Sequence, residues 1–167
     1  MQLSVNTSRK VIEFDGKSYP CRIGRDGATP AATGREGDFK TPLGTYNLRY
    51  GFYRADRLPP PPTALTFWPI RADDGWCDAP GDPAYNQQVR LPYRASAETL
   101  MRDDPAYDVI IVLGHNDSPP VAGKGSAIFL HITRVDDVQT AGCIAISPDV
   151  MAELLPRLSP GDKIVVI

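Results

Sequence analysis

The first part of the chain alternates between hydrophobic and polar residues with a period of two. The alternation covers Gln2–Val5, Lys10–Phe14 and Lys17–Ile23. This period places successive side chains on opposite faces of a β-strand. Polar residues separate the three segments, and Asp15-Gly16 is a strong signal for a tight hairpin turn. The sequence therefore predicts a β-meander at its beginning.

The other hydrophobic segments are short, and most of them are typical of strands. Further strands are expected over Leu43–Arg49, Leu65–Arg71, Asp108–Gly114, Ala127–Leu130 with Ile132, Ile144–Ile146 and Lys163–Ile167. Asp108–Gly114 is a continuous run of apolar, mostly β-branched residues. Such a run predicts a central strand that is buried on both faces.

Two segments predict helices. Ser96 is a suitable N-cap for a short helix over Ala97–Arg102. Ser147 followed by proline is a second helix start, and the apolar positions after it predict a helix over about Asp149–Leu158. Pro156 is expected to kink the last turn of this helix or to end it early.

The segments between these elements are rich in turn-forming residues. Gly24–Thr41 has no periodicity and predicts a long loop, and Pro59–Pro62 predicts a stiff surface connector. The 167 residues include 17 prolines and 14 glycines, a composition that suits short strands joined by many turns. We therefore expect a mainly β fold, a sandwich or barrel with one or two packed helices, as a single domain over residues 1–167.

Composition and charge exclude several classes of protein. The net charge is −2 with both signs interspersed, so no basic stripe indicates nucleic acid as a partner. No window of about 18 apolar residues predicts a membrane span. The spacing of the three cysteines forms no C-x-x-C unit, which would indicate a zinc or redox site. A Cys21–Cys77 disulfide is left open. The chain starts as a strand, which predicts a cytoplasmic protein if this N-terminus is native and a periplasmic or cell-envelope protein if a signal peptide was removed.

The stretch from Gly125 to Ile146 carries the candidate chemistry. Two neighbouring strands each present one reactive side chain there, His131 and Cys143. An imidazole that takes the proton of a thiol makes it a usable nucleophile, and the backbone amides of Gly142 and Cys143 are candidate oxyanion donors. The alternative is that both side chains are ordinary core residues. His115 is the rival base, and we prefer His131 because sequential strands commonly pair.

Residue identities add a family resemblance over about residues 20–167. The strand histidine followed by T-A-G-C at Thr140–Cys143 resembles the catalytic motif of the L,D-transpeptidase (YkuD-type) family. R-E-G-D-F-K-T-P-L-G-T-Y at Arg35–Tyr46 is similar to a second signature of that family. The sequence departs from the family pattern at two positions: Ala141, where many members have histidine, and Ala145, where many have an arginine. The missing arginine puts substrate placement in doubt.

The resemblance implies an L,D-transpeptidase-like β fold with a long active-site loop, and it implies roles for individual residues. Cys143 is expected to be the nucleophile, His131 the base and then the acid, and Gly142 part of the oxyanion site, with the carbonyl of Ile132 fixing the imidazole tautomer. The candidate substrate-binding residues are Thr140, Ile132, Trp76, Asp78, Tyr85, Asn86, Asn116 and Arg134. For Trp76 the alternative is that it fills the core.

The function that the resemblance implies is acyl transfer at the L,D-peptide bond before the terminal D-alanine of a peptidoglycan tetrapeptide stem. With water as acceptor the enzyme is an L,D-carboxypeptidase, which we favour, and with a second stem it is an L,D-transpeptidase. Peptidoglycan stem peptides or muropeptides are the expected partners, with no cofactor or metal and a monomeric state. A binding domain without catalysis, and a metal hydrolase using His115 and Asp117, are the alternatives.

Overall fold

A computed structural model describes residues 1–133 and 139–167. The strands are β1 Gln2–Asn6, β2 Val11–Phe14, β3 Lys17–Arg22, β4 Ala28–Pro30, β5 Thr41–Tyr53, β6 Phe67–Pro69, β7 Asp74–Cys77, β8 Gln88–Arg90, β9 Ala97–Thr99, β10 Val109–Leu113, β11 Phe129–Ile132, β12 Ile144–Ile146 and β13 Lys163–Val166. The helical segments are the 3₁₀ turn η1 Pro105–Tyr107, the α-helix α1 Pro148–Leu154 and the 3₁₀ turn η2 Leu155–Arg157. The expected mainly β fold is confirmed.

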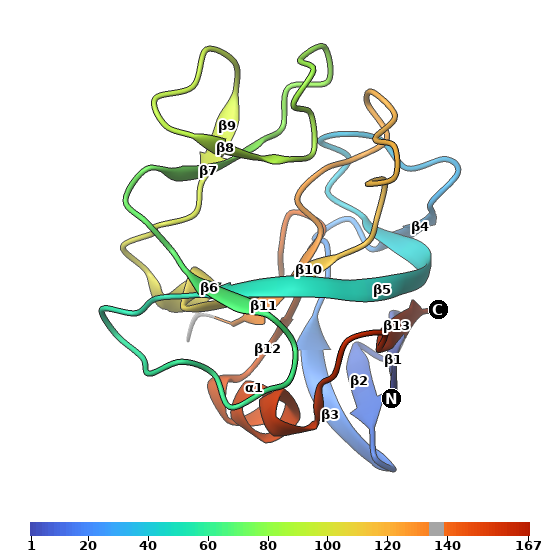
Figure 1. Ribbon diagram of the computed structural model, residues 1–167. Helices are drawn as coiled ribbons and strands as arrows, with labels where there is room; N and C mark the ends of the chain where they lie inside the picture. The colour runs from blue at the N-terminus through green and yellow to red at the C-terminus, as the bar shows by residue number, and fades with distance from the viewer. Residues whose placement is uncertain (134–138) are drawn as a thin grey trace.

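The main sheet closes on itself. Its strands follow the order β10-β11-β12-β3-β2-β1-β13-β5-β4, and β10 also pairs with β5. The long strand β5 therefore joins the two ends of the sheet and completes a barrel-like arrangement (Figure 1). The predicted meander is present as β1, β2 and β3 in antiparallel pairs.

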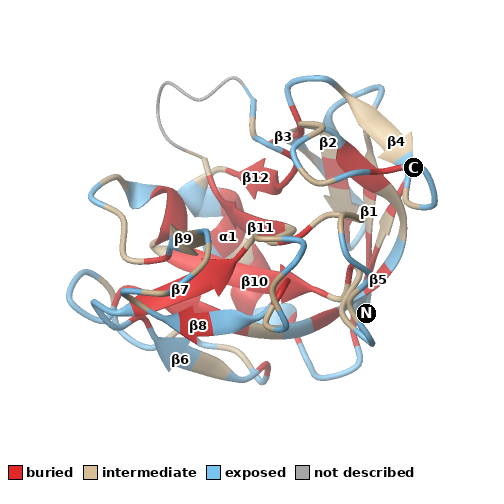
Figure 2. Ribbon diagram, turned by 90° about the horizontal axis from the view of Figure 1, so that it is seen from above, coloured by how far each residue is buried: buried red, intermediate tan, exposed pale blue. Residues whose placement is uncertain are grey.

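The barrel has a hydrophobic interior. Inward-facing residues of β1, β2, β5, β10, β11, β12 and β13 form one buried cluster, and the apolar face of α1 packs against it. β10 is buried along its whole length, as its continuous apolar run predicts. Figure 2 shows this burial concentrated in the strands at the centre of the molecule. The rigid strands that carry the candidate site are therefore held on one side by this core.

A second, smaller sheet covers the other face of β10 and β11. It has the order β8-β7-β9 and lies on the side of the barrel away from α1 (Figure 1). Trp76 of β7 packs edge-on against Phe129 of β11, with ring centroids 5.2 Å apart. Tyr107 of η1 packs against the same phenyl ring at 5.9 Å. These aromatic contacts form a second core between the two sheets.

The helix at the end of the chain is shorter than the sequence predicts. Ser147 caps α1, and its side chain accepts a hydrogen bond from the Val150 amide. Pro156 lacks an amide hydrogen, so the α-helix ends at Leu154 and continues as the 3₁₀ turn η2.

The predicted helix over Ala97–Arg102 is wrong. Ala97–Thr99 forms β9, which pairs antiparallel with β7. The N-cap signal at Ser96 is local, whereas the backbone hydrogen bonds with β7 come from a partner distant in sequence and determine the conformation. The strand predicted over Leu65–Arg71 shrinks to β6, and the predicted loop Gly24–Thr41 contains the short strand β4.

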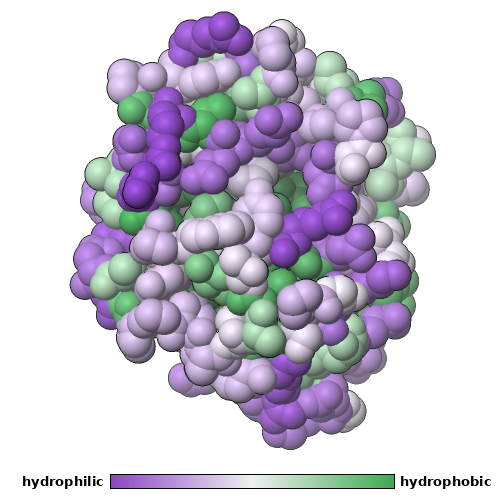
Figure 3. Space-filling model, in the orientation of Figure 1, coloured by the Kyte–Doolittle hydropathy of each residue, from purple (hydrophilic) through white to green (hydrophobic). Residues whose placement is uncertain are grey.

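All three cysteines are free and buried, so the Cys21–Cys77 disulfide that the sequence left open is not formed. On the face shown in Figure 3, hydrophilic and hydrophobic side chains are interspersed. Among the described residues, no helix has the length and the apolar character needed to cross a membrane.

Candidate active site

Two paired strands bring His131 and Cys143 to one cavity. β11 and β12 are parallel neighbours, with Leu130 opposite Ile144 and His131 opposite Ala145. Cys143 directly precedes β12 and therefore lies beside Phe129 at the start of β11. His131 comes two residues after Phe129, so its side chain is on the same face of the strand. The two side chains line a cavity of about 250 Å³, together with residues of β9, η1 and the turn before Cys143.

The thiol of Cys143 is buried and hydrogen-bonded on both sides. Its Sγ lies 3.1 Å from the carbonyl oxygen of Ala127, to which it donates, and accepts from the Phe129 amide at 3.4 Å. The residue is 9% exposed. Burial raises the pKa of Cys143 to about 12, and the nearby carboxylate of Glu98 adds to this increase. The resting side chain is therefore a neutral thiol rather than a thiolate.

The imidazole of His131 is held in one orientation. Its Nδ1 lies 2.9 Å from the carbonyl oxygen of Ile132, as predicted, and its ring packs edge-on against Tyr107 at 5.3 Å. A carbonyl oxygen only accepts hydrogen bonds, so Nδ1 carries the hydrogen in the neutral ring and Nε2 carries the lone pair. This is the tautomer that a general base needs. The side chain of Ile132 lines a different cavity, next to α1.

The turn before Cys143 is fixed by two threonines. The Thr140 hydroxyl donates to the Cys143 carbonyl at 2.6 Å and accepts from the Gly142 amide at 3.1 Å. The buried hydroxyl of Thr41, from the T-P-L-G-T-Y segment, donates to the Gly142 carbonyl at 2.9 Å. Gly142 has φ +140°, and a Cβ there would lie 3.1 Å from the Lys40 carbonyl oxygen. Glycine therefore suits both the backbone conformation and the space.

Three residues that the sequence did not indicate form the opposite wall of the cavity. They are Glu98 of β9, Tyr107 of η1 and Arg102 between them. The Tyr107 hydroxyl donates to Glu98, and the Arg102 guanidinium lies 5.0 Å above the Tyr107 ring. Burial raises the pKa of Glu98, while its hydrogen bond from Tyr107 and the charge of Arg102 act in the opposite direction. No local pattern marks these residues, because distant pairings bring them to the cavity.

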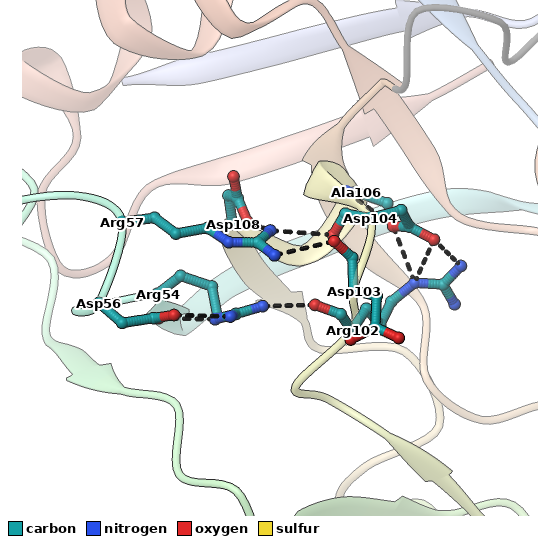
Figure 4. A network of polar contacts seen from close by, with 8 residues as sticks. All are labelled: Arg54, Asp56, Arg57, Arg102, Asp103, Asp104, Ala106 and Asp108. Atoms are coloured by element: carbon teal, nitrogen blue, oxygen red, sulfur yellow. Dashed lines mark hydrogen bonds and ion pairs between the residues drawn. The ribbon is translucent and has the colours of Figure 1, made fainter.

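An ion-pair network fastens the segment that carries Arg102 and Tyr107 (Figure 4). Arg57, in the turn after β5, donates to Asp108 at 2.7 Å and to the backbone carbonyl of Asp103 at 2.8 Å. The buried Arg54 guanidinium donates to the Arg102 carbonyl. The Arg102 side chain itself pairs with Asp104 at 2.6 Å. This wall of the cavity is therefore anchored to the turn that directly follows β5.

Trp76 and Asn86, two predicted substrate residues, are buried and hydrogen-bonded to each other. Trp76 is 3% exposed and lies in the aromatic core. Its indole Nε1 donates to the Asn86 carboxamide at 3.0 Å. Both residues line a separate cavity of about 470 Å³, which the Phe129 side chain also lines. These contacts agree with the alternative that Trp76 fills the core.

Of the other predicted substrate residues, Thr140 lines the cavity with Cys143, whereas Tyr85, Asn116 and Asp78 do not. The Tyr85 hydroxyl donates to Glu36 at 2.5 Å, and burial is the main cause that raises its pKa. The Asn116 carboxamide binds the backbone of its own loop at Val121 and Gly125. Asp78 is half-buried, and its charge is one of the causes that raise the pKa of Glu98. Arg134 lies outside the described residues.

His115 lies in a different environment from His131. It is 6% exposed, its Nε2 lies 3.1 Å from the Lys124 carbonyl oxygen, and it lines a cavity of about 40 Å³ that does not include Cys143. Burial lowers its pKa. Asp117, its partner in the metal-hydrolase alternative, forms a bidentate ion pair with Arg49. Within residues 1–133 and 139–167, no three His, Cys, Asp or Glu side chains are grouped as metal ligands.

Solved structures with a similar arrangement of the chain come from several bacteria. An L,D-transpeptidase from Mycobacterium smegmatis has a TM-score of 0.47 at 16% identity, over 99% of this chain and 58% of the other. L,D-transpeptidase 1 from Mycobacterium tuberculosis has a TM-score of 0.45 at 16% identity, over 99% and 60%. The helical cell shape determining protein Pgp2 from Campylobacter jejuni has a TM-score of 0.46 at 17% identity, over 99% and 46%. The chain thus spans about half to three fifths of the length of these proteins.

A comparison with protein families identifies the family of the chain, which the solved structures do not. No curated protein matches the chain. The family described as the L,D-transpeptidase catalytic domain matches residues 3–167, which is nearly the whole chain. That range includes both strands of the cavity, its His131 and Cys143, and the T-P-L-G-T-Y segment that holds the turn at Gly142. The chain therefore belongs to the L,D-transpeptidase catalytic domain family.

Proposed function

We propose that this protein is a cysteine acyl-transfer enzyme acting on the L,D-peptide bond before the terminal D-alanine of peptidoglycan tetrapeptide stems. The observation that carries the proposal is the shared cavity of Cys143 and His131, with the histidine in the tautomer of a general base. In this proposal residues 1–167 form one catalytic domain, and soluble muropeptides or stem peptides are its substrates.

The first half of the proposed reaction transfers the acyl group of the stem to Cys143. His131 Nε2 takes the thiol proton of Cys143, and Sγ attacks the carbonyl carbon of the bond before D-alanine. The oxyanion of the tetrahedral intermediate accepts a hydrogen bond from the Cys143 amide. The Gly142 amide donates to Thr140 in the resting state, so it joins the oxyanion site only after leaving that partner. The imidazolium then gives its proton to the departing amine, and a thioester on Cys143 remains.

Arg102 is the proposed group for substrate placement. The family arginine is absent at Ala145, which is fully buried in β12. Arg102 comes from another part of the chain, but its side chain lines the same cavity as Cys143. A guanidinium in this position suits the carboxylate of the terminal D-alanine, because arginine binds planar carboxylates through two parallel hydrogen bonds. Its existing partner, Asp104, is then displaced or shares the cation.

Water is the proposed acyl acceptor, which makes the enzyme an L,D-carboxypeptidase. The cavity of about 250 Å³ is smaller than most sites for drug-sized ligands, which supports entry of one stem end rather than two stems together. Crosslinking by L,D-transpeptidation uses the same catalytic residues and is the alternative. A binding domain without turnover is the third outcome that an experiment has to separate.

The experiment follows the products of purified protein by mass. A disaccharide tetrapeptide and intact sacculi are incubated separately with the wild type and with Cys143→Ala. Loss of one D-alanine to give the tripeptide, only with the wild type, supports the carboxypeptidase. A dimer linked between two diamino acid centres identifies a transpeptidase. Unchanged substrates with the folded wild type contradict the enzymatic proposal and favour the binding domain.

A further inference from the structure

The carboxamide of Asn86 uses its full hydrogen-bonding capacity inside the protein. Its Oδ1 accepts from the Trp76 indole at 3.0 Å and from the Ala127 amide at 3.0 Å. Its Nδ2 donates to the backbone carbonyls of His115 at 3.0 Å and Asn116 at 2.8 Å. A flipped amide would place its NH₂ group against two N–H donors, so the partners fix the orientation. Asn86 is 6% exposed, so its carboxamide and the groups bonded to it are largely shielded from water.

Ala127, one partner of Asn86, has an unusual backbone conformation. Its φ is +52°, in the left-handed region that costs a residue with a Cβ about 1–2 kcal/mol. Neighbouring groups have to hold such a residue in place. Its amide on one side is bound by Asn86, and its carbonyl on the other side accepts the thiol of Cys143 at 3.1 Å. A continuous series of hydrogen bonds therefore leads from Asn86 through Ala127 to the nucleophile.

We propose that Asn86 is a positioning residue for Cys143: it fixes Ala127 so that the Ala127 carbonyl holds the S–H group, and the enzyme rests as a neutral thiol with Sγ in place. The Phe129 amide, which donates to Sγ, supplies a second fixed contact. Rotation about the Cβ–Sγ bond then breaks the hydrogen bond to Ala127 without moving the sulfur. The proton passes to His131 Nε2, which gives a thiolate and an imidazolium.

This arrangement has a functional consequence. A neutral, hydrogen-bonded thiol resists oxidation and alkylation better than an exposed thiolate, because the thiolate is the reactive form. Attack on substrate still starts from a fixed sulfur position. The ionisable groups that surround this thiol are His131 of β11, Tyr107 of η1, Glu98 of β9 and the nearby Arg102. The inference rests on the proposed role of Cys143 as nucleophile.

The test is labelling of each cysteine by iodoacetamide at pH 8, followed by peptide mass spectrometry. Asn86→Ala removes the anchor of Ala127, so Cys143 loses a fixed acceptor for its proton and is expected to react about tenfold faster, the effect of one pKa unit. Cys21 and Cys77 are buried free thiols. Cys21 in β3 reports on general loosening of the fold, and Cys77, whose backbone is hydrogen-bonded to that of Asn86, reports on loosening next to the substitution. They are expected to keep their wild-type rates. Equal acceleration of all three cysteines, or an unchanged rate at Cys143 in the folded variant, overturns the inference.

Asp82→Ala is the matched control. Asp82 is half-buried in the same connection between β7 and β8, and its side chain accepts hydrogen bonds from Ala84, Tyr93 and Arg94. No hydrogen bond from its side chain leads to Ala127 or Cys143 within the described part of the chain. Its loss removes a similar number of hydrogen bonds but is expected to leave the labelling of Cys143 relative to Cys21 and Cys77 unchanged. A selective increase at Cys143 in this control contradicts a specific role for Asn86.

An infrared measurement tests the contact in the wild type and does not depend on whether Asn86→Ala folds. The difference spectrum between wild type and Cys143→Ala isolates the S–H stretch of this thiol. We expect a band shifted to lower frequency than that of the thiols in the unfolded protein, because a carbonyl acceptor weakens the S–H bond. A band at the frequency of a free thiol overturns the inference. Neither the iodoacetamide labelling nor the infrared measurement needs substrate, so both are independent of the product assay for the proposed function.

Discussion

Replacement of Thr41 by valine is expected to destabilise the protein and to disturb the turn that carries the nucleophile. The Thr41 side chain is fully buried. Its hydroxyl accepts from the Gly24 amide at 2.8 Å and donates to the Gly142 carbonyl at 2.9 Å. Valine has nearly the same shape but no hydroxyl, so it leaves one buried donor and one buried acceptor without this partner.

The size of the effect follows from these two contacts. A buried polar group that loses its partner costs about 1–3 kcal/mol, so the loss of both partners in Thr41→Val is expected to lower the free energy of unfolding by about 2–6 kcal/mol. Thr41→Ser keeps the hydroxyl and loses one methyl group, which costs about 1 kcal/mol. With a urea m-value of about 2 kcal/mol/M, the valine variant should unfold at a midpoint at least about 1 M lower than the wild type.

Urea unfolding of the three proteins, followed by circular dichroism, is the assay. The m-value should stay constant, and acylation of Cys143 should be slower in Thr41→Val than in Thr41→Ser, because only valine releases the Gly142 carbonyl. If the two variants unfold within about 0.5 kcal/mol of each other, the smallest difference expected for one net hydrogen bond, the hydroxyl does not hold this turn and the reasoning is refuted.

Three further predictions concern the charged and titratable groups. His131→Ala should slow acylation by about 10²–10⁴, whereas His115→Ala should change the rate little because it lines another cavity; stopped-flow acylation compares them, and equal losses would reject His131 as the base. Arg102→Gln should raise KM more than it lowers kcat for stems with a free terminal carboxylate, and equal KM values for wild type and variant would exclude carboxylate binding at Arg102. Burial raises the pKa of Cys143 to about 12 and of Cys21 to about 11, above the value of about 8.5 in the unfolded chain. The folded protein therefore holds these thiol protons more tightly than the unfolded chain does. The contribution of the two neutral thiols to the free energy of unfolding is complete below about pH 8.5 and is lost as the pH rises towards the folded values. Urea unfolding should therefore show stability falling from pH 9 upwards, less steeply in Cys143→Ala by up to about 1.4 kcal/mol per pH unit, and a stability that is constant up to pH 11 would contradict the burial effect.

The residues with local signatures were predictable from the sequence. Alternation and apolar runs indicated most barrel strands, and the order of His131 and Cys143 in neighbouring strands indicated their proximity. The contact of His131 with the Ile132 carbonyl was also predictable, because it involves adjacent residues.

Features that depend on distant pairing were not predictable. β9 was expected to be a helix because its partner β7 lies about 20 residues away and no local pattern reports that pairing. The position of Glu98 in the cavity was therefore not predictable from the sequence. The four hydrogen-bond partners of Asn86 were not predictable either, because they come from β7, the turn after β10 and the approach to β11. An exposed ligand-binding amide and a buried structural amide have the same sequence signature.

The most direct test of the account is the mass of the intact protein during reaction with a disaccharide tetrapeptide. The protein is quenched in acid at short times, and the modified peptide is identified by proteolysis. We expect an acyl adduct of the stem without its terminal D-alanine, located on Cys143, that appears in step with free D-alanine and is absent from Cys143→Ala. Release of D-alanine by the Cys143→Ala variant at the wild-type rate would contradict the account, as would the absence of both adduct and D-alanine with the folded wild type.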